Sequence, residues 1–255
     1  KESLPKKPTK DIADKKYGFF QSDKAFFEEV AADMGLIPNK SGKDIGFERH
    51  PLAYLVEAAD DICYTIIDFE DGINLGLVQE EYALEYLIKL VKDSIDSAKY
   101  STLNTKEDRI SYLRALAIGS LINDAVRVFI ENEEAILAGK FPYALTDKSK
   151  DKAQMDDIIK LSVKNIYQSR EVIEKEIVGY QIIQTLLDKF ISAMNNKFNR
   201  TASNYDQLIL KMLPEKHNVE KENLYDRLLH ICHYVSMLTD GNALELFEMI
   251  NGTKK

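Results

Sequence analysis

A continuous helical pattern from Arg49 to Gly72 constrains the fold more than any other part of the sequence. At a helical step of about 100° per residue, most of its apolar side chains fall on one arc. These are Leu52, Leu55, Val56, Ala59, Ile62, Cys63, Ile66 and Ile67. Pro51 suits the first turn, where a missing backbone N–H costs nothing, and Gly72 suits the end. The pattern predicts one helix with a buried apolar arc, on which Cys63 is a buried free thiol.

Beside that arc lies an acidic stripe, which comprises Glu57, Asp60, Asp61, Tyr64, Asp68 and Asp71. No Lys or Arg occurs between Arg49 and Lys89, so nearby sequence offers nothing to relieve repulsion among these carboxylates. One interpretation is a solvated helix face. The other is a site that receives a cation, either a metal ion or a metal with a phosphate ligand. Spacing alone leaves both interpretations open.

The rest of the chain also reads as helical, because no stretch alternates apolar and polar residues for long enough to predict a sheet. The sequence therefore predicts an all-α fold. The loop at 139–152 is the most plausible internal boundary, unless it only joins helices of one body. A tight joint between two helices is expected near Ser169. Helices are expected over 22–35, 79–100, 108–138, 155–166, 170–198, 204–212, 221–238 and 242–250.

Composition narrows the classes of function. The 255 residues carry a net charge of −8, which argues against broad affinity for nucleic acids or anionic membranes. No apolar run approaches the roughly 18 residues of a membrane span, and no signal peptide is visible, so a soluble cytoplasmic protein without a membrane partner is expected. The two cysteines, Cys63 and Cys232, lack the spacing of metal ligands.

The long helix carries the phrase Arg-x-Pro-Leu-x-x-Leu-x-Glu-Ala-Ala-Asp-Asp-Ile-x-Tyr, followed by Asp-x-Glu-Asp. This phrase resembles the signature of bacterial dGTP triphosphohydrolases, which are dNTP triphosphohydrolases among the HD-domain phosphohydrolases. Weaker matches keep the order of that family and extend the resemblance over nearly the whole chain. They are Lys16–Ser22, Ala138–Phe141, Gly179-Tyr180 and Tyr234–Asp240. The resemblance implies a multi-helix, HD-domain-like assembly.

The resemblance also assigns roles on the acidic stripe. The family's metal site combines a His, a His-Asp pair and a later Asp, and Asp60 matches the later Asp. A carboxylate there suits Mg²⁺ or Mn²⁺. Tyr64 and Asp68 match residues that contact the nucleotide, Tyr64 through a phosphate oxygen and the sugar, Asp68 through a sugar hydroxyl. Glu57 and Asp61 are expected to orient their neighbours.

The histidines depart from the family pattern. None of His50, His217, His230 and His233 is followed by Asp, and no two of them precede Asp60 as the family requires. The missing ligands would lie upstream of the motif at Lys16. The chain therefore resembles the C-terminal part of a larger helical enzyme and is expected to be inactive alone. His50 is predicted to cap the long helix, and His230 and His233 to be partly buried packing residues.

By resemblance, the chain is part of a metal-dependent enzyme that converts dGTP or another dNTP and water into a deoxynucleoside and triphosphate. Two alternatives stay open: another HD-type metal phosphohydrolase, and a non-catalytic helical module for oligomerisation or effector binding. The resemblance also implies a homo-oligomer, and it admits a nucleotide or single-stranded DNA as effector.

Overall fold

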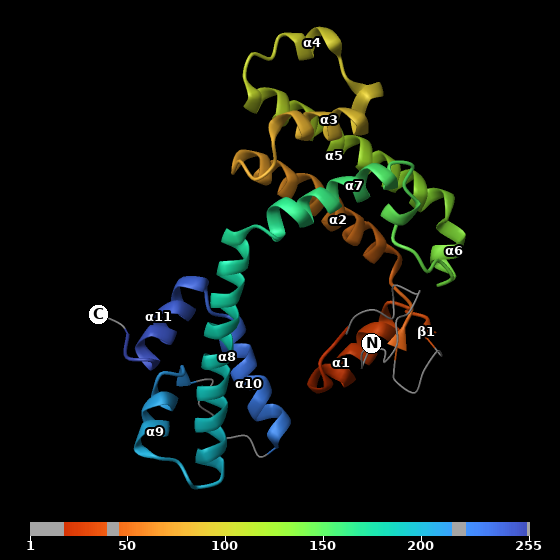
Figure 1. Cartoon of the computed structure of the whole chain (residues 1–255). Coiled ribbons are helices and arrows are strands. Elements are labelled where there is room, and N and C mark those ends of the chain that lie inside the picture. The colour runs from red at the N-terminus through yellow and green to blue at the C-terminus, as the bar shows by residue number, and fades with distance from the viewer. Residues whose placement is uncertain (1–17, 40–45, 216–222, 254–255) are drawn as a thin grey trace. The chain divides into compact units, whose positions relative to one another are not determined.

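The structure, a computed structural model, describes residues 18–39, 46–215 and 223–253 (Figure 1). It confirms an all-α fold. The chain divides into two compact units, Lys1–Ser169 and Arg170–Lys255, near the joint expected at Ser169 rather than in the loop at 139–152. That loop joins helices of the first unit. None of the helices in the described ranges combines the length and apolarity needed to cross a bilayer.

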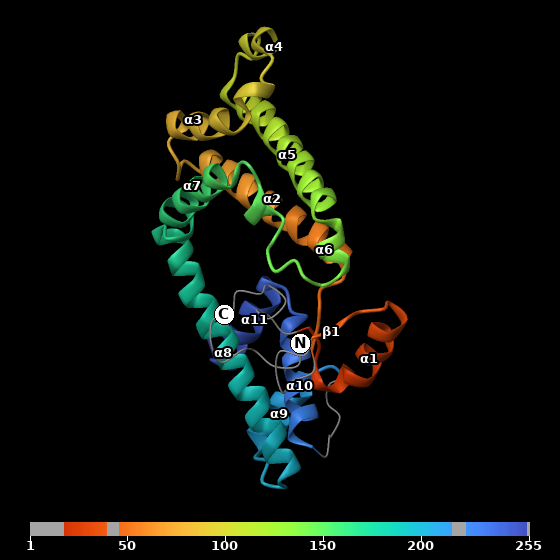
Figure 2. The same ribbon diagram turned by 90° about the vertical axis from the view of Figure 1, so that its right-hand side faces the viewer.

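The first unit is built mainly from three helices that pack against the long helix α2 (Pro51–Asn74). These are α3 (Glu80–Val91), α5 (Lys106–Glu131) and α7 (Lys152–Ser162); α2 and α5 lie side by side in both views (Figure 2). Short helices complete the unit: α1 (Lys24–Asp33), α4 (Ser97–Ser101) and α6 (Glu133–Leu137). Single turns are η2 (Gln21–Asp23), η3 (Lys92–Ser94), η4 (Thr146–Lys148) and the π-helical η5 (Val163–Tyr167).

The structure breaks two helices that the sequence predicts as continuous. The helix expected over 79–100 stops at Val91, and Asp96 begins a new one by accepting from the backbone N–H groups of Ala98 and Lys99. The helix expected over 108–138 is interrupted at Asn132. A small antiparallel sheet was also not predicted. Its strands β1 (Pro38–Asn39) and β2 (Gly46–Phe47) are too short to show an alternating pattern.

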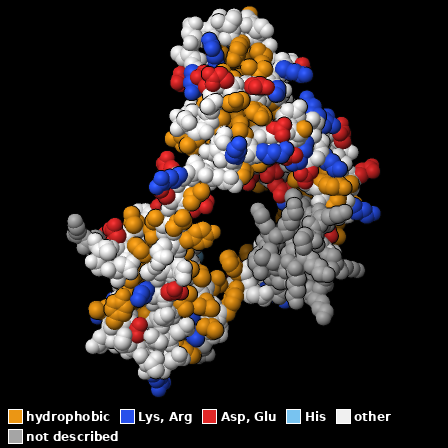
Figure 3. All heavy atoms as spheres, in the orientation of Figure 1, with side chains coloured by type: hydrophobic (Ala, Val, Ile, Leu, Met, Phe, Trp, Pro, Cys, Tyr) orange, Lys and Arg blue, Asp and Glu red, His pale blue; other side chains and the backbone are white. Residues whose placement is uncertain are grey.

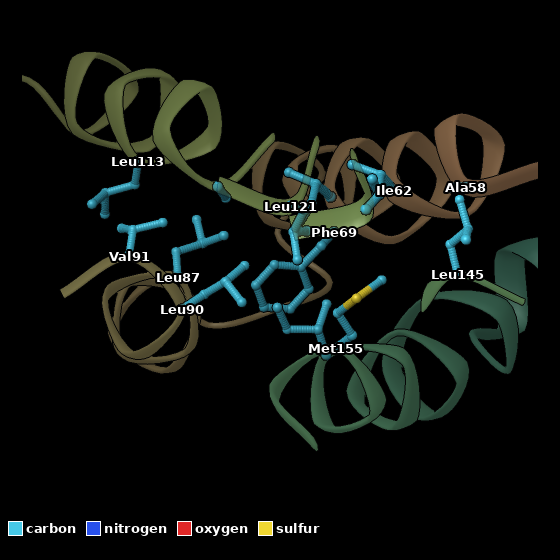
Figure 4. Close-up of a cluster of buried hydrophobic side chains, with 14 of the residues drawn as sticks. Ala58, Ile62, Phe69, Leu87, Leu90, Val91, Leu113, Leu121, Leu145 and Met155 are labelled. Atoms are coloured by element: carbon cyan, nitrogen blue, oxygen red, sulfur yellow. The ribbon is translucent and has the colours of Figure 1, made fainter. Parts of the chain in front are cut away.

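The buried arc of α2 differs from the predicted one. Buried positions include Tyr54, Ala58, Ile62, Ile66, Phe69 and Ile73, which pack with residues of α3, α5 and α7 (Figure 4). Leu52 and Val56 are 58% and 71% exposed, and Cys63 is exposed as well, so the predicted buried thiol is wrong. The physical reason is that α2 carries more apolar residues than one arc holds. Periodicity finds the apolar residues but does not show which of them the chain itself covers.

Two polar contacts lie at the margin of this core. Glu70 of α2 is buried and accepts two hydrogen bonds from Nη1 of Arg114 on α5, at 2.9 and 2.7 Å. Asp124 is also buried. Burial alone would raise the pKa of its carboxyl, but hydrogen bonds from Ser149, Arg127 and the backbone N–H of Lys150 outweigh burial and lower it. Both acids therefore have hydrogen-bond partners within the unit.

The second unit packs α9 (Asn204–Lys211), α10 (Leu224–Ser236) and α11 (Asp240–Ile250) against α8 (Arg170–Phe198). The ring of Tyr234, from the last family-like motif, forms a T-shaped contact with the fully buried Phe190 at a centroid distance of 5.4 Å. His230 is partly buried, as predicted. His233 is exposed, so the prediction that it is a partly buried packing residue is wrong.

The corrected arc of α2 makes a stability prediction for the 255-residue chain. Ile62→Ala removes a 2%-exposed side chain and is expected to lower the free energy of unfolding by about 2–5 kcal/mol. Val56→Ala, on the exposed side of the same helix, is expected to change it by less than about 0.5 kcal/mol. Urea unfolding of both variants measures the difference. Equal losses of unfolding free energy would show that Val56 is buried in the core.

Candidate functional site

The carboxylates of the stripe follow the geometry of α2. Asp60, Tyr64 and Asp68 stand four residues apart and therefore lie along one side of the helix. The helix begins as predicted, because Nδ1 of His50 accepts from the backbone N–H of Leu52 at 3.2 Å. Asp60 is exposed and has no hydrogen bond or ion pair with any described residue. Its carboxylate is therefore available to a ligand.

A residue that the sequence did not indicate joins this side of α2. Tyr167 ends the π turn η5, and its hydroxyl donates to Oδ2 of Asp68 at 2.5 Å. Its ring lies nearly parallel to that of Tyr64, with centroids 5.6 Å apart and planes 19° apart. Burial, followed by the hydrogen bonds with Asp68 and Tyr64, raises the pKa of Tyr167. The tyrosine is therefore a neutral donor at physiological pH.

The π turn reaches α2 because Gly72 has no side chain. A Cβ atom at position 72 would lie 2.2 Å from Cδ1 and 2.7 Å from Cγ1 of Ile166, the buried residue that precedes Tyr167. These distances are far below van der Waals contact. Gly72 therefore permits the close packing that places Tyr167 against Asp68 and Tyr64.

Glu57 and Asp61 bind neighbouring parts of the same unit. Glu57 accepts from Nη1 of Arg49 at 2.5 Å, and the Arg49 guanidinium lies over the ring of Tyr54. Asp61 accepts from the hydroxyl of Thr146 at 2.8 Å. Burial raises the pKa of Asp61 despite that hydrogen bond, and repulsion from Glu57, Asp60 and Asp147 adds to the increase. The two acids help to hold α2 in place, and their influence on ligand binding stays a prediction.

Two of the weaker motifs have structural roles in the first unit. The Tyr54 hydroxyl donates to the carbonyl of Phe141 at 2.6 Å, and Gly139 has a positive φ of 66° that favours glycine. In the upstream motif, the ring of Phe19 stacks on Phe27 at 4.4 Å, while Lys16 and Tyr17 lie outside the described residues.

The described residues provide one candidate metal ligand rather than a complete site. Among them, no three His, Cys, Asp or Glu side chains are grouped so that they could hold a metal ion. His217 lies outside the described ranges. An exposed carboxylate such as that of Asp60 is a hard oxygen donor and fits Mg²⁺ or Mn²⁺ as one ligand among several.

The fold and this side of α2 define an all-α protein that presents carboxylates along one helix, where Tyr64 of the helix stacks on Tyr167 of the π turn η5. No family model matches the chain. It is 33% identical over 255 residues to a deoxyguanosinetriphosphate triphosphohydrolase-like protein of Synechocystis sp., a match that covers 98% of this chain and 55% of that protein. A protein of the same name from Listeria monocytogenes is 32% identical, with 95% of this chain and 56% of that protein covered.

A deoxyguanosinetriphosphate triphosphohydrolase of Yersinia pestis is 30% identical over 190 residues, which are 68% of this chain and 36% of that protein. The chain is therefore a homologue of the deoxyguanosinetriphosphate triphosphohydrolase-like proteins and matches their C-terminal portion, which confirms the resemblance. The chain spans little more than half the length of the relatives from Synechocystis and Listeria.

The approach of the π turn can be tested by filling the space at Gly72. Gly72→Ala is expected to lower the free energy of unfolding by about 1–3 kcal/mol, because the new methyl group displaces Ile166. The loss is expected to shrink in the Ile166→Ala background, where the clashing atoms are absent.

Gly119→Ala is the matched control, because a Cβ at this helical glycine meets nothing within 4 Å. This change is expected to be neutral or to stabilise by about 0.5–1 kcal/mol. Urea unfolding of the four variants measures these effects. Identical losses for the two glycine variants would show that no close approach exists at Gly72.

Proposed function

We propose that the whole protein hydrolyses a deoxynucleoside triphosphate to a deoxynucleoside and triphosphate. The observation that carries this proposal is the alignment of Asp60, Tyr64 and Asp68 on one accessible side of α2, beside Tyr167. The similarity of the chain to proteins that are named as deoxyguanosinetriphosphate triphosphohydrolases supports the same proposed activity. We assign this chain one metal ligand and part of the nucleotide pocket.

Asp60 is the proposed metal ligand. It is the member of the trio that has no partner among the described residues, and a divalent cation would relieve the repulsion that it shares with Asp61. When bound, Mg²⁺ or Mn²⁺ supplies a water of lowered pKa and neutralises charge on phosphoryl oxygens. A single carboxylate does not form a catalytic metal site, so we propose that the chain alone does not turn over a nucleotide.

Asp68 and the two tyrosines are proposed to hold the nucleotide. The Tyr167 hydroxyl occupies one oxygen of Asp68, which leaves the carboxylate able to accept a further hydrogen bond from a sugar hydroxyl. Tyr64 is 54% exposed and presents both a hydroxyl and a ring edge one turn from Asp60. Because Tyr167 stacks on Tyr64, the position of this ring is fixed before a ligand arrives.

A matched pair of acids tests the metal ligand in the whole protein. Asp60→Ala is expected to abolish release of triphosphate from dGTP, whereas Asp71→Ala, at the far end of the same helix, is expected to leave the rate nearly unchanged. Both variants lose one exposed carboxylate from α2, so a purely electrostatic role would make them equal. Equal rates would show that the acidic stripe is only a solvated helix face. Release of orthophosphate by the wild type would indicate another HD-type phosphohydrolase.

Asp68→Asn tests the nucleotide pocket. Asn still accepts a hydrogen bond but lacks the charge, a loss on the order of 1.5–3 kcal/mol. At about 1.4 kcal/mol per decade, kcat/KM is expected to fall roughly tenfold to a hundredfold. Affinity for Mn²⁺, measured separately by calorimetry, is expected to stay unchanged.

Tyr167→Phe keeps the stacked ring and removes only the hydroxyl that positions Asp68, so its effect on kcat/KM is expected to be smaller than that of Asp68→Asn. Loss of Mn²⁺ binding in Asp68→Asn would make Asp68 the metal ligand and move the assignment by two turns of α2.

A further inference from the structure

A polar cleft lies in the first unit between α3, α5 and α7, on residues that the proposed activity does not use. It consists of two adjoining hollows of about 350 and 530 Å³, and both are lined by Ser94, Ser120 and Lys150. The smaller hollow lies at the end of α3 and the start of α7, and the larger one lies along α5. Volumes of this size are typical of small-molecule sites. We call the two hollows together the α3–α5–α7 cleft.

Two side chains of the smaller hollow carry oxygens that lack hydrogen-bond partners. Oδ2 of Asp151 and Oε1 of Gln154 are covered from solvent, and neither accepts a hydrogen bond from any described residue. A buried acceptor without a donor destabilises a fold, and it loses no partner when it turns toward a ligand. Because both oxygens are acceptors, the group that would satisfy them is a donor.

The charges around Asp151 indicate that this donor is a cation. Burial raises the pKa of the Asp151 carboxyl; the charge of Lys150 opposes the increase, and repulsion from Asp124 and Asp93 adds to it. A cation beside Asp151 would offset that repulsion. No three metal-ligating side chains are grouped within the described ranges, which favours an organic cation over a metal ion. An ammonium group has three N–H donors and can therefore serve Asp151 and Gln154 together.

The opposite charge is available next to Asp151. The side chain of Lys150 is exposed and lines both hollows, and its ammonium group forms no ion pair with any residue that the structure describes. The hydroxyl of Ser120, which lines both hollows as well, is also without a hydrogen bond in the described part of the chain. A carboxylate on the ligand would accept from both groups.

The surface charge around the cleft is mixed. Acidic and basic side chains lie close together over α3 and α7 on the visible face of the molecule (Figure 3). Such a mixture is complementary to a ligand that carries both charges and is less suited to a polyanion.

The larger hollow is small-sided and apolar along α5, where Ala115, Leu116 and Gly119 line it. Gly119 lies inside a 26-residue helix, where glycine is less favourable than alanine. Packing does not require this glycine, because a Cβ there would meet nothing within 4 Å. The missing side chain leaves the hollow open beside Ser120. An apolar group of the ligand can therefore lie against α5.

We propose that the α3–α5–α7 cleft binds a free α-amino acid with an apolar side chain. The ammonium group of the amino acid donates to Asp151 and Gln154. Its carboxylate accepts from Lys150 and Ser120, and its side chain lies over Gly119. Lys150 and Asp151 are neighbours in sequence and do not pair with each other, which suits the two adjacent charges of an α-amino acid. This binding is independent of the proposed hydrolysis.

Matched probes test the two charges without any mutation. In calorimetry of the whole protein, at least one of L-leucine, L-methionine and L-phenylalanine is expected to bind. For the tightest of them, the amine that lacks only the carboxylate and the acid that lacks only the ammonium group are expected to bind about tenfold or more weakly. For phenylalanine these are 2-phenylethylamine and 3-phenylpropanoate. No binding of the three amino acids overturns the proposal, and so does an amine or acid that binds as tightly as the amino acid.

A pair of variants locates the bound amino acid. Asp151→Asn removes the charge and keeps the shape, and the Asp151 side chain makes no capping hydrogen bond with α7 that could be lost. Its Kd is expected to rise about tenfold or more. Asp157→Asn is the control, because Asp157 also lines the cleft but already accepts from Lys160 at 3.1 Å. Its Kd is expected to change by less than about twofold. Equal changes in the two variants overturn the site at Asp151.

Filling the larger hollow gives a test by shape. Gly119→Leu is expected to abolish binding of the amino acid and to leave the urea midpoint of the protein nearly unchanged, because the new side chain enters open space. Unchanged affinity in this variant overturns the placement of the side chain over Gly119. None of these measurements uses a metal ion or a dNTP. An inactive protein that binds the amino acid would keep this inference and remove the proposed activity, and an active protein that binds none would do the reverse.

Discussion

The contact between α2 and α5 is the interaction on which the first unit depends. Glu70 accepts two hydrogen bonds from Arg114 of α5, and the neighbouring Phe69 is fully buried with its ring against Tyr86 of α3. Together they fix the rotation of α2 about its own axis. Because each residue adds about 100°, a fixed rotation leaves no freedom for the other sides of the helix. The carboxylates and the exposed apolar residues therefore take their directions from the packing of the core.

A second constraint sets the shape of the proposed pocket. Tyr167 approaches Asp68 only because Gly72 lets the π turn pack closely on α2. π turns are rare and often occur at functional sites, since the widened turn reorients a side chain that a regular helix would direct elsewhere. Here the turn brings a hydroxyl to a carboxylate 99 residues away in sequence. The pocket thus depends on a backbone irregularity and on a missing side chain.

Local periodicity accounts for what the sequence predicted well. The ranges of α2, α8 and α9 follow from apolar spacing and capping residues, and the alignment of Asp60, Tyr64 and Asp68 follows from their spacing of four. The buried arc followed only in part, because α2 carries more apolar residues than one arc holds. Tyr54 and Glu70 are also buried, through partners that are distant in sequence, Phe141 and Arg114. Tyr167 was missed for the same reason. Contacts between distant segments leave no local pattern.

Asp60 lies on the accessible side of α2, directly before Asp61, and the two carboxylates repel each other. Any ligand that covers Asp60 takes water from its carboxylate, and desolvation disfavours the charged form. A divalent cation at the carboxylate offsets that penalty, since the charge is then paired rather than isolated.

Asp61 shows the cost of losing water one residue away. Burial raises the pKa of its carboxyl although the hydroxyl of Thr146 donates a hydrogen bond to it. One hydrogen bond from a hydroxyl therefore does not replace the lost water, whereas a cation brings an opposite charge to a carboxylate. The difference between the two neighbours favours Asp60 rather than Asp61 as the ligand of the proposed metal, since Asp61 already uses its carboxylate within the unit.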